Sequence, residues 1–478
     1  MNNAQTHLKM GYVWTICLVA ACGGLLFGYD WVVIGGAKPF YEAWFSITDP
    51  AQSGWAMSSA LLGCIFGALI SGWCADKLGR KLPLILSAVL FSASAWGTAV
   101  ASHFDMFVVY RIVGGVGIGL ASALSPLYIA EVSPAEKRGR FVAVNQLTIV
   151  IGVLAAQLIN LMIAEPVEPG ATQQMIVDSW NGQMGWRWMF GAELVPALAF
   201  LVLMFFVPES PRWLMKAGKP ERARAALERI GSADYADRIL REIAHTLEKD
   251  NNKVSYGALL APQVKPIVII GMVLAIFQQW CGINVIFNYA QEIFASAGFD
   301  INSTLKSIVA TGVVNLVFTI AALPLVDKIG RRKLMLLGAS GLTLIYVLIA
   351  GAYAMGIMGW PVLLLVLAAI AIYALTLAPV TWVLLAEIFP NRVRGLAMSL
   401  GTLALCIACF LLTYTFPLLN AGLGAAGSFL LYGVICAAGY LYILRNVPET
   451  KGITLEALEE QLAQRHTGVN AAKQEQMR

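Results

Sequence analysis

The sequence predicts an all-α polytopic membrane protein, built from twelve transmembrane helices in two pseudo-symmetric halves of six. Hydrophobic residues make up 58% of the 478 positions and charged residues only 13%. Apolar runs of about 18 residues or more recur along the chain, and a soluble domain has no core large enough to bury them. In addition, a set of charged motifs occurs twice in the same order, which indicates an internal repeat.

The apolar runs define the spans to within a few residues at each end. The expected spans are 12–36, 54–75, 82–101, 106–130, 141–163, 186–207, 266–293, 304–326, 334–356, 361–388, 396–419 and 424–445. With the N-terminus inside, all but four of the 33 Lys and Arg residues fall in inside loops and tails. Lys38, Arg187 and Lys306 fall outside, which leaves Arg111 as the one basic residue expected within a span. The positive-inside rule therefore predicts cytoplasmic termini.

The same pattern divides the chain into four segments. The N-terminal half covers 1–207 and the C-terminal half 266–452, with a cytoplasmic tail, 453–478, that is expected to begin as a helix. The interval 208–265 is rich in Arg, Glu and Ala and predicts a cytoplasmic linker with short amphipathic helices. Fewer than about 60 residues are too few for an independent enzymatic domain. Since the sequence also offers no nucleophile–base pair or metal-ligand cluster, we expect no enzyme activity, metal or cofactor.

Three charged motifs follow the second, fourth and sixth spans of each half, at offsets of 251, 256 and 240 residues. The pairs are Asp76–Lys81 with Asp327–Arg332, Ala130-Glu131-x-x-Pro134-x-x-x-Arg138-Gly139 with Ala386-Glu387-x-x-Pro390-x-x-x-Arg394-Gly395, and Pro208–Arg212 with Pro448–Gly452. A parallel repeat of six plus six spans is the architecture of transporters that rock two halves around a site at the midplane.

Asp30 ends the run Gly23-Gly24-Leu25-Leu26-Phe27-Gly28-Tyr29-Asp30 within the first span. A carboxylate at the bilayer centre costs about 2.5–3.5 kcal/mol on insertion scales, so it needs a reason to be there. At 1.5 Å per residue, Asp30 and Arg111 both lie about 9 Å below the outer ends of their spans. Asp30 either neutralises Arg111 in a purely structural role or carries a proton. The second role is open to it because burial and a nearby cation shift the pKa of a carboxyl group in opposite directions. Glu193 is a second buried acid, which either relays protons or forms only a hydrogen bond.

Together with two further motifs, these residues resemble the sugar porter family of the major facilitator superfamily. The further motifs are Arg111-x-x-x-Gly115-x-Gly117-x-Gly119 and Gln278-Gln279-x-x-Gly282-x-Asn284. The sequence is most similar to the bacterial proton-coupled pentose and hexose symporters. The resemblance implies the major facilitator fold, a central sugar cavity and alternating access. It also implies proton coupling through Asp30, since passive members commonly carry Asn there.

The resemblance further assigns residues to sugar binding. They are Gln146, Gln278, Gln279, Asn284, Asn288, Tyr289, Asn315 and Trp382. Amides suit sugar hydroxyls, and an aromatic ring suits the weakly apolar sugar face. Gln278 and Asn284 are six residues apart, about 240° around a regular helix. One cavity uses both side chains only if the helix breaks, and Gly282 is the expected place.

The resemblance gives the repeated loop motifs a gating role. The residues concerned are Asp76, Arg80, Glu131, Arg138, Asp327, Arg331, Glu387 and Arg394. Ion pairs that bridge helices, or the two halves, while the cytoplasmic side is shut would bias a two-state equilibrium. The alternative is that these charges are topology signals and static clamps.

The expected function is import of a neutral pentose or hexose together with a proton. The expected partners are a small neutral sugar, a proton and the lipid bilayer, with no nucleic acid, and the monomer is the expected functional unit in a bacterial inner membrane. A passive sugar or inositol-like polyol facilitator and a non-transporting sugar sensor are the alternatives. Several positions depart from the family pattern and leave the sugar open; they are Val153, Asn288, Leu405, Cys406 and Cys409.

Overall fold

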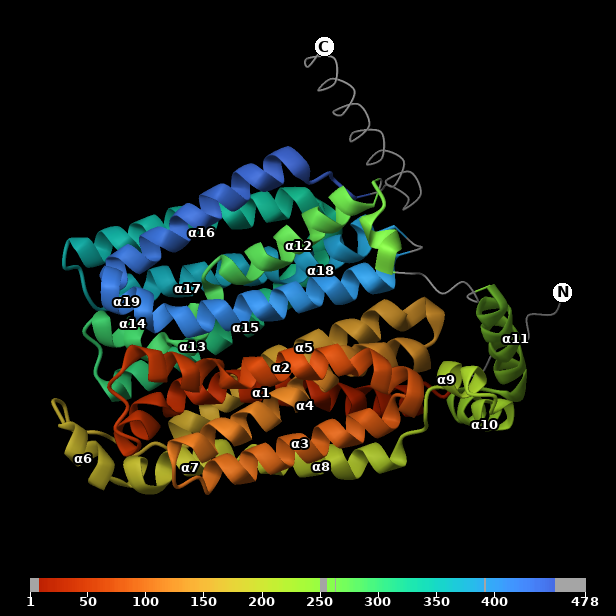
Figure 1. Cartoon of the computed structure of the whole chain (residues 1–478), viewed down its shortest axis with the longest axis horizontal. Coiled ribbons are helices and arrows are strands. Elements are labelled where there is room, and N and C mark those ends of the chain that lie inside the picture. The colour runs from red at the N-terminus through yellow and green to blue at the C-terminus, as the bar shows by residue number, and fades with distance from the viewer. Residues whose placement is uncertain (1–7, 250–255, 263, 391–392, 452–478) are drawn as a thin grey trace, which may run out of the picture. The chain divides into compact units, whose positions relative to one another are not determined.

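The computed structural model describes residues 8–249, 256–262, 264–390 and 393–451, and their secondary structure is helical (Figure 1). These residues form two compact units. The first unit contains the described residues up to 47 and 59–249, and the second contains 48–58 and the described residues from 256 onward. The segment boundaries at 207, 265 and 452 stay predictions, and the tail 453–478 lies outside the described residues.

The first unit holds the long helices of the predicted N-terminal half. They are α1 (Met10–Trp44), α2 (Pro50–Leu78), whose first residues belong to the second unit, α3 (Lys81–Ala99), α4 (Phe104–Val132) and α5 (Arg138–Ile163). The short helix α6 (Gln173–Asp178) precedes the sixth span, which consists of η2 (Asn181–Gly185), α7 (Trp186–Gly191) and α8 (Leu194–Phe206). Helix α1 packs against α4, α5 and α8, and α3 packs against α4. The helix that carries Asp30 therefore lies among the other helices of this unit.

Short helices follow in the predicted linker, as expected from the sequence. They are α9 (Pro211–Lys216), α10 (Pro220–Ile230), α11 (Ala233–Lys249) and η3 (Tyr256–Leu260). The first three lie together in Figure 1. Leu214, Ala223 and Ala226 form their small buried core, with Trp213 and Leu240 packed against it.

The second unit contains long helices, as the first does, and two short ones of six and seven residues. They are α12 (Lys265–Trp280), α13 (Ile283–Asn288), α14 (Ala290–Ser296), α15 (Ile301–Ile329), α16 (Arg331–Ala354), α17 (Trp360–Leu375), α18 (Leu377–Ile388) and α19 (Arg394–Asn446). Helix α16 packs against α17 and α19, and α12 packs against α18 and α19.

Eleven helices of the described chain are long and apolar enough to span a membrane. One of them, α19, has 53 residues, or about 80 Å at 1.5 Å per residue, whereas a hydrocarbon core is about 30 Å thick. Gly424 has non-helical angles within it (φ 68°, ψ 175°), so α19 is two helices joined at a kink. This accounts for the last two of the twelve predicted spans, which were expected to meet between 419 and 424.

Two spans break where the sequence places a proline inside an apolar run. Pro196 has no N–H to donate to the carbonyl of Ala192, and the sixth span turns between α7 and α8, at Ala192 and Glu193. Pro379 has the same relation to Leu375, and the tenth span breaks at Thr376 (φ −123°, ψ −82°). Glu193 thus lies at a helix junction, a position that the hydropathy pattern did not reveal.

Helix α1 extends beyond the first predicted span, and the position of Lys38 relative to the membrane stays a prediction. Helix α1 continues to Trp44, well past the predicted end at residue 36, and encloses Lys38. Lys38 is 3% exposed, and its Nζ lies 3.1 Å from Glu42 Oε1, one turn further along the helix. The helix tolerates the charge because an acidic side chain at i+4 neutralises it.

Candidate functional site

Asp30 and Arg111 meet in the interior of the first unit, as the sequence predicted. Arg111 Nη1 donates to Asp30 Oδ1, and Arg111 Nη2 donates to the Asp30 carbonyl oxygen at 3.1 Å. The two residues are 2% and 1% exposed. The guanidinium carbon also lies 5.5 Å from the centre of the Phe190 ring, a cation–π contact that the sequence did not predict. Helices α1, α4 and α7 therefore build one buried charged site.

Glu193 is the third member of this cluster. It is 1% exposed and interacts electrostatically with both Asp30 and Arg111. Among the described residues, Asp30 Oδ2, Glu193 Oε1 and Arg111 Nε have no hydrogen-bond partner. Two carboxyl groups and one guanidinium are electrically neutral only when one carboxyl group holds a proton. The arrangement is chemically suited to bind and release a proton.

Small residues allow this approach of helices. A Cβ on Gly114 would lie 2.4 Å from Ser94 Oγ and 3.1 Å from Asp30 Oδ2, so the site has no room for a side chain there. Gly28 faces the backbone of α5 in the same way, because a Cβ would lie 1.9 Å from the carbonyl oxygen of Ile149. The glycines next to Asp30 and Arg111 are thus packing requirements of the charged site.

The predicted break at Gly282 is confirmed. Gly282 adopts the left-handed conformation (φ 85°) between α12 and α13. On the two sides of the break, Asn284 Nδ2 donates to Gln279 Oε1. Gln279 Nε2 donates to Gln278 Oε1 at 2.6 Å, and Gln278 Nε2 donates to Tyr373 Oη of α17 at 2.5 Å. We call these four side chains the amide relay.

The other predicted sugar-binding residues lie outside the amide relay, and their role stays a prediction. Gln146 is exposed on α5 of the first unit, and Trp382 is half-buried on α18 of the second. Asn288 and Asn315 are buried, at 4% and 8% exposed. Tyr289 is buried, and its hydroxyl donates to the carbonyl oxygen of Thr413 at 2.5 Å.

Sequence reasoning missed Tyr373 and did not predict the contact of Cys409 with Asn284. Tyr373 is the one polar side chain in the apolar run 361–375, which is its only signal in the sequence. Cys409 was one of the departures from the family pattern, and its sulfur lies 3.6 Å from Asn284 Nδ2, within reach of a hydrogen bond. Tyr373 is thus a member of the relay, and Cys409 lies next to it.

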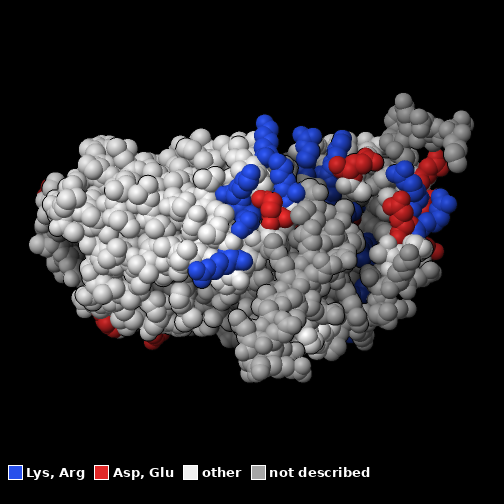
Figure 2. Space-filling model, turned by 90° about the horizontal axis from the view of Figure 1, so that it is seen from above, with Lys and Arg blue, Asp and Glu red and all other residues white. Residues whose placement is uncertain are grey.

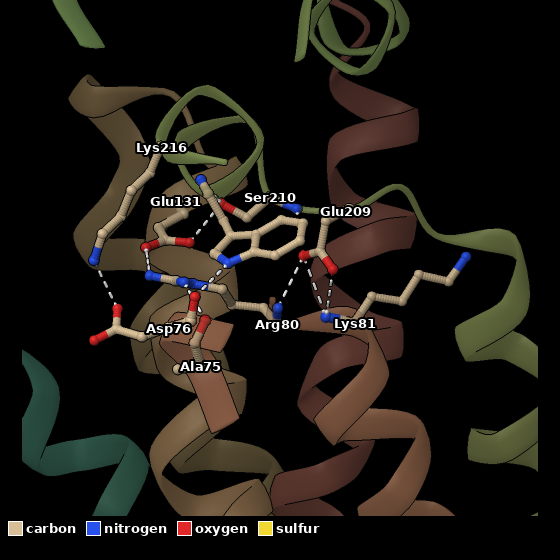
Figure 3. A network of polar contacts seen from close by, with 9 residues as sticks. Ala75, Asp76, Arg80, Lys81, Glu131, Glu209, Ser210 and Lys216 are labelled. Carbon is tan, nitrogen blue, oxygen red and sulfur yellow. Dashed lines mark hydrogen bonds and ion pairs between the residues drawn. The ribbon is translucent and has the colours of Figure 1, made fainter. Parts of the chain in front are cut away.

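The charged motifs of the first half converge on Arg80 and Glu131 (Figure 3). Arg80 Nη2 lies 2.8 Å from Glu131 Oε1, and Arg80 Nη1 donates to the carbonyl oxygen of Ala75. Ser210 Oγ donates to Glu131 Oε2 at 2.5 Å. Glu209 Oε1 accepts from the backbone N–H of Arg80 at 2.9 Å. The three motifs thus join the ends of α2, α3, α4 and α9.

The second half repeats this network. Arg331 Nη2 lies 3.0 Å from Glu387 Oε1, and Arg331 Nη1 donates to the carbonyl oxygen of Val326. Thr450 Oγ1 donates to Glu387 Oε2 at 2.5 Å, and Glu449 Oε1 accepts from the N–H of Arg331 at 2.9 Å. The sequence repeat is therefore a repeat of contacts, with Thr450 in the place of Ser210.

Four predicted gating residues remain outside these two networks. Asp76 pairs with Lys216 of α9 at 2.8 Å rather than with Arg80, and both side chains are exposed. Arg138 is exposed, and Arg394 Nε donates to the carbonyl oxygen of Phe389. The side chain of Asp327 is outside the described part of the structure. The contacts found for Glu131 and Glu387 lie within their own units, so bridging across the halves stays a prediction.

Comparison with known proteins identifies the same family as the motifs. Residues 16–462 match the family described as Sugar (and other) transporter. The D-xylose-proton symporter of Escherichia coli K12 is 39% identical, over 95% of this chain and 96% of the relative. The arabinose-proton symporter of Bacillus subtilis is 35% identical, over 96% of this chain and 99% of the relative.

The solved structures that match belong to the same group. The xylose transporter XylE of Escherichia coli in an inward-open conformation has a TM-score of 0.82 and 36% identity, over 94% of this chain and 99% of that chain. The same proton:xylose symporter bound to 6-bromo-6-deoxy-D-glucose has a TM-score of 0.77 and 38% identity, over 95% of this chain and all of that chain. The predicted family and fold are confirmed: the chain belongs to the Sugar (and other) transporter family and has the major facilitator fold.

Proposed function

We propose that the protein imports a neutral monosaccharide, a pentose or hexose, together with a proton by alternating access. The observation that carries the proposal is the buried cluster of Asp30, Arg111 and Glu193. Glu193 interacts electrostatically with the paired Asp30 and Arg111, and a net charge in the membrane interior is costly. The cluster is therefore expected to hold one proton and to release it when a water path or a movement changes its surroundings. The names of the xylose and arabinose symporters agree with this chemistry.

The amide relay supports a sugar as the substrate. Gln278, Gln279 and Asn284 offer donors and acceptors but no charge, which suits hydroxyl groups. The cations buried in α1 and α4 are each paired with a carboxylate, Lys38 with Glu42 and Arg111 with Asp30. An acidic sugar would find no free counter-charge in either pair. We therefore propose that the predicted sugar-binding residues line a site for a neutral ligand.

We further propose that the protein is a monomer in the bacterial inner membrane, with both termini in the cytoplasm. The distribution of basic residues along the sequence supports the cytoplasmic termini, and the bacterial relatives support the inner membrane. On the face drawn in Figure 2, Lys and Arg gather on one side, and the opposite stretch is nearly bare of charge. The repeated ion-pair networks of Arg80 and Arg331 are proposed to stabilise the state in which the cytoplasmic side is closed.

Replacement of Asp30 by Asn tests proton coupling. Asn keeps the size and hydrogen-bonding capacity of the side chain but cannot carry a proton. In proteoliposomes we expect Asp30→Asn to lose uphill sugar uptake driven by a pH gradient, while counterflow of labelled sugar survives. Wild-type protein with a collapsed gradient is the control. Uphill uptake at the wild-type rate in the variant would refute the assignment. Wild-type counterflow without any gradient-driven accumulation would favour the passive facilitator instead.

A further inference from the structure

The amide relay ends at the hydroxyl group of Tyr373, to which the first of its three amides is hydrogen-bonded. Tyr373 is 8% exposed, and Gln278 and Gln279 are each 6% exposed. In the described chain, Tyr373 Oη accepts the hydrogen bond from Gln278 Nε2. We propose that Tyr373 is a positioning residue that fixes the orientation of the three amides and so determines which sugar hydroxyls the site distinguishes. This inference rests on the proposed sugar transport.

The groups that the relay leaves for a ligand follow from counting its hydrogen atoms. An amide has two N–H donors and one carbonyl acceptor. The Asn284 amide nitrogen donates to Gln279 Oε1 and has Cys409 Sγ within reach at 3.6 Å, so its two N–H groups suffice for both contacts. The Asn284 side chain is half-buried, more accessible than the two glutamines. Its carbonyl oxygen takes part in neither of these contacts, and we expect it to accept a hydrogen bond from a sugar hydroxyl.

The two glutamines also use most of their hydrogen-bonding groups within the relay. Gln279 and Gln278 each use their oxygen as an acceptor and one N–H as a donor within the relay, which leaves each with one N–H. Loss of the Tyr373 hydroxyl would leave the Gln278 N–H without this acceptor and would free its amide to turn. A turned Gln278 no longer offers its oxygen to Gln279, and the change passes on to Asn284. Tyr373 therefore acts on the ligand through residues that it orients.

Equilibrium sugar binding to the purified full-length protein tests this inference, without a membrane or a pH gradient. The ligands are D-xylose, L-arabinose and D-glucose, together with a deoxy analogue of whichever sugar binds. Tyr373→Phe should weaken binding about two- to twelvefold, as expected for one lost hydrogen bond. It should also reduce the ratio of affinities between the sugar and its deoxy analogue, which a merely structural role would not change.

A double-mutant cycle tests whether the effect travels through the relay. Tyr373 and Asn284 lie at its opposite ends. If the two residues act independently, the effects of the two single substitutions on the dissociation constant of the sugar should multiply. We expect Tyr373→Phe to weaken binding at least twofold less in an Asn284→Ala background than in the wild type. Tyr346→Phe is the matched control, because Tyr346 is fully buried in the same unit and its hydroxyl has no hydrogen-bond partner among the described residues.

Each outcome separates the inference from the proposed function. If the wild-type protein binds none of the neutral sugars, the proposed function fails. If it binds one of them but the cycle is additive, or Tyr346→Phe has the same effect as Tyr373→Phe, the role of Tyr373 is overturned and the proposed function stands. Tyr373→Leu replaces Tyr373→Phe if the latter does not elute as a folded protein in size-exclusion chromatography.

Discussion

The ion pair of Arg80 with Glu131 is buried more deeply than its counterpart in the second half. The side chains of Arg80 and Glu131 are 10% and 7% exposed, whereas those of Arg331 and Glu387 are 14% and 25% exposed. Removing one partner of a buried pair costs about 3–5 kcal/mol, because the remaining charge is left in a dry site. An exposed pair contributes about 0–1 kcal/mol. The two halves should therefore respond differently to the same substitution.

We expect Glu131→Gln to lower the free energy of unfolding by about 3 kcal/mol. Glu387→Gln should lower it by about 1–2 kcal/mol, between the buried and exposed limits. In both variants the amide keeps the shape of the side chain and one acceptor oxygen, so the lost charge is what is measured. Since 1 kcal/mol shifts Tm by about 2–4 °C in a unit of 150–250 residues, the two Tm values should differ by at least about 2 °C.

Thermal unfolding in one detergent, followed by intrinsic tryptophan fluorescence, measures this difference. Lys216→Gln is the control, because it removes an ion pair with Asp76 whose side chains are 55% and 63% exposed. It should leave Tm within about 1 °C. A larger loss of Tm for Glu387→Gln than for Glu131→Gln would show that burial does not set the strength of these pairs.

The remaining predictions concern packing, pH and specificity. Gly28→Ala should lower the free energy of unfolding by about 1–3 kcal/mol, because its Cβ would meet the backbone of α5. Gly351→Ala, which has open space around it, should leave the free energy of unfolding unchanged or raise it. Equal unfolding temperatures for the two variants would contradict this account. Burial raises the pKa of Glu209 despite its backbone N–H donors, so the ionised carboxylate disfavours the folded state. The Tm of the wild type relative to Glu209→Gln should fall as pH rises from about 4.3 through the raised pKa, and a rise of the wild-type Tm relative to that of the variant over this range would refute the sign. Uptake of labelled sugar should be inhibited by neutral pentoses or hexoses and not by glucuronate or glucose-6-phosphate; the reverse pattern would overturn the neutral site.

Much of the fold could be predicted from the sequence because the bilayer makes the problem local. In the hydrocarbon core there is no water to bind backbone groups, so each segment must satisfy its own backbone hydrogen bonds. The length of an apolar run is therefore enough to indicate a spanning helix. The break at Gly282 was predicted from the spacing of Gln278 and Asn284, whereas the kink at Gly424 was found only in the structure, where two separate spans had been expected. The meeting of Asp30 with Arg111 was predictable as well, because the sequence offers few charges at that depth and an unpaired one is costly.

The contacts between distant segments were decided by the tertiary structure. Lys38 was expected in an outside segment because the first apolar run was predicted to end at residue 36, whereas α1 continues through Lys38, which pairs with Glu42 one turn further along. Tyr373 and Gln278 are 95 positions apart, and an apolar run gives no sign of which hydroxyl will face an amide. Ser210 completes the Glu131 network across 79 positions. The sequence by itself determined where helices run and which charges must be neutralised. The structure decided which side chain neutralises or orients each polar group, because that depends on helix packing and not on the spacing of residues along one helix.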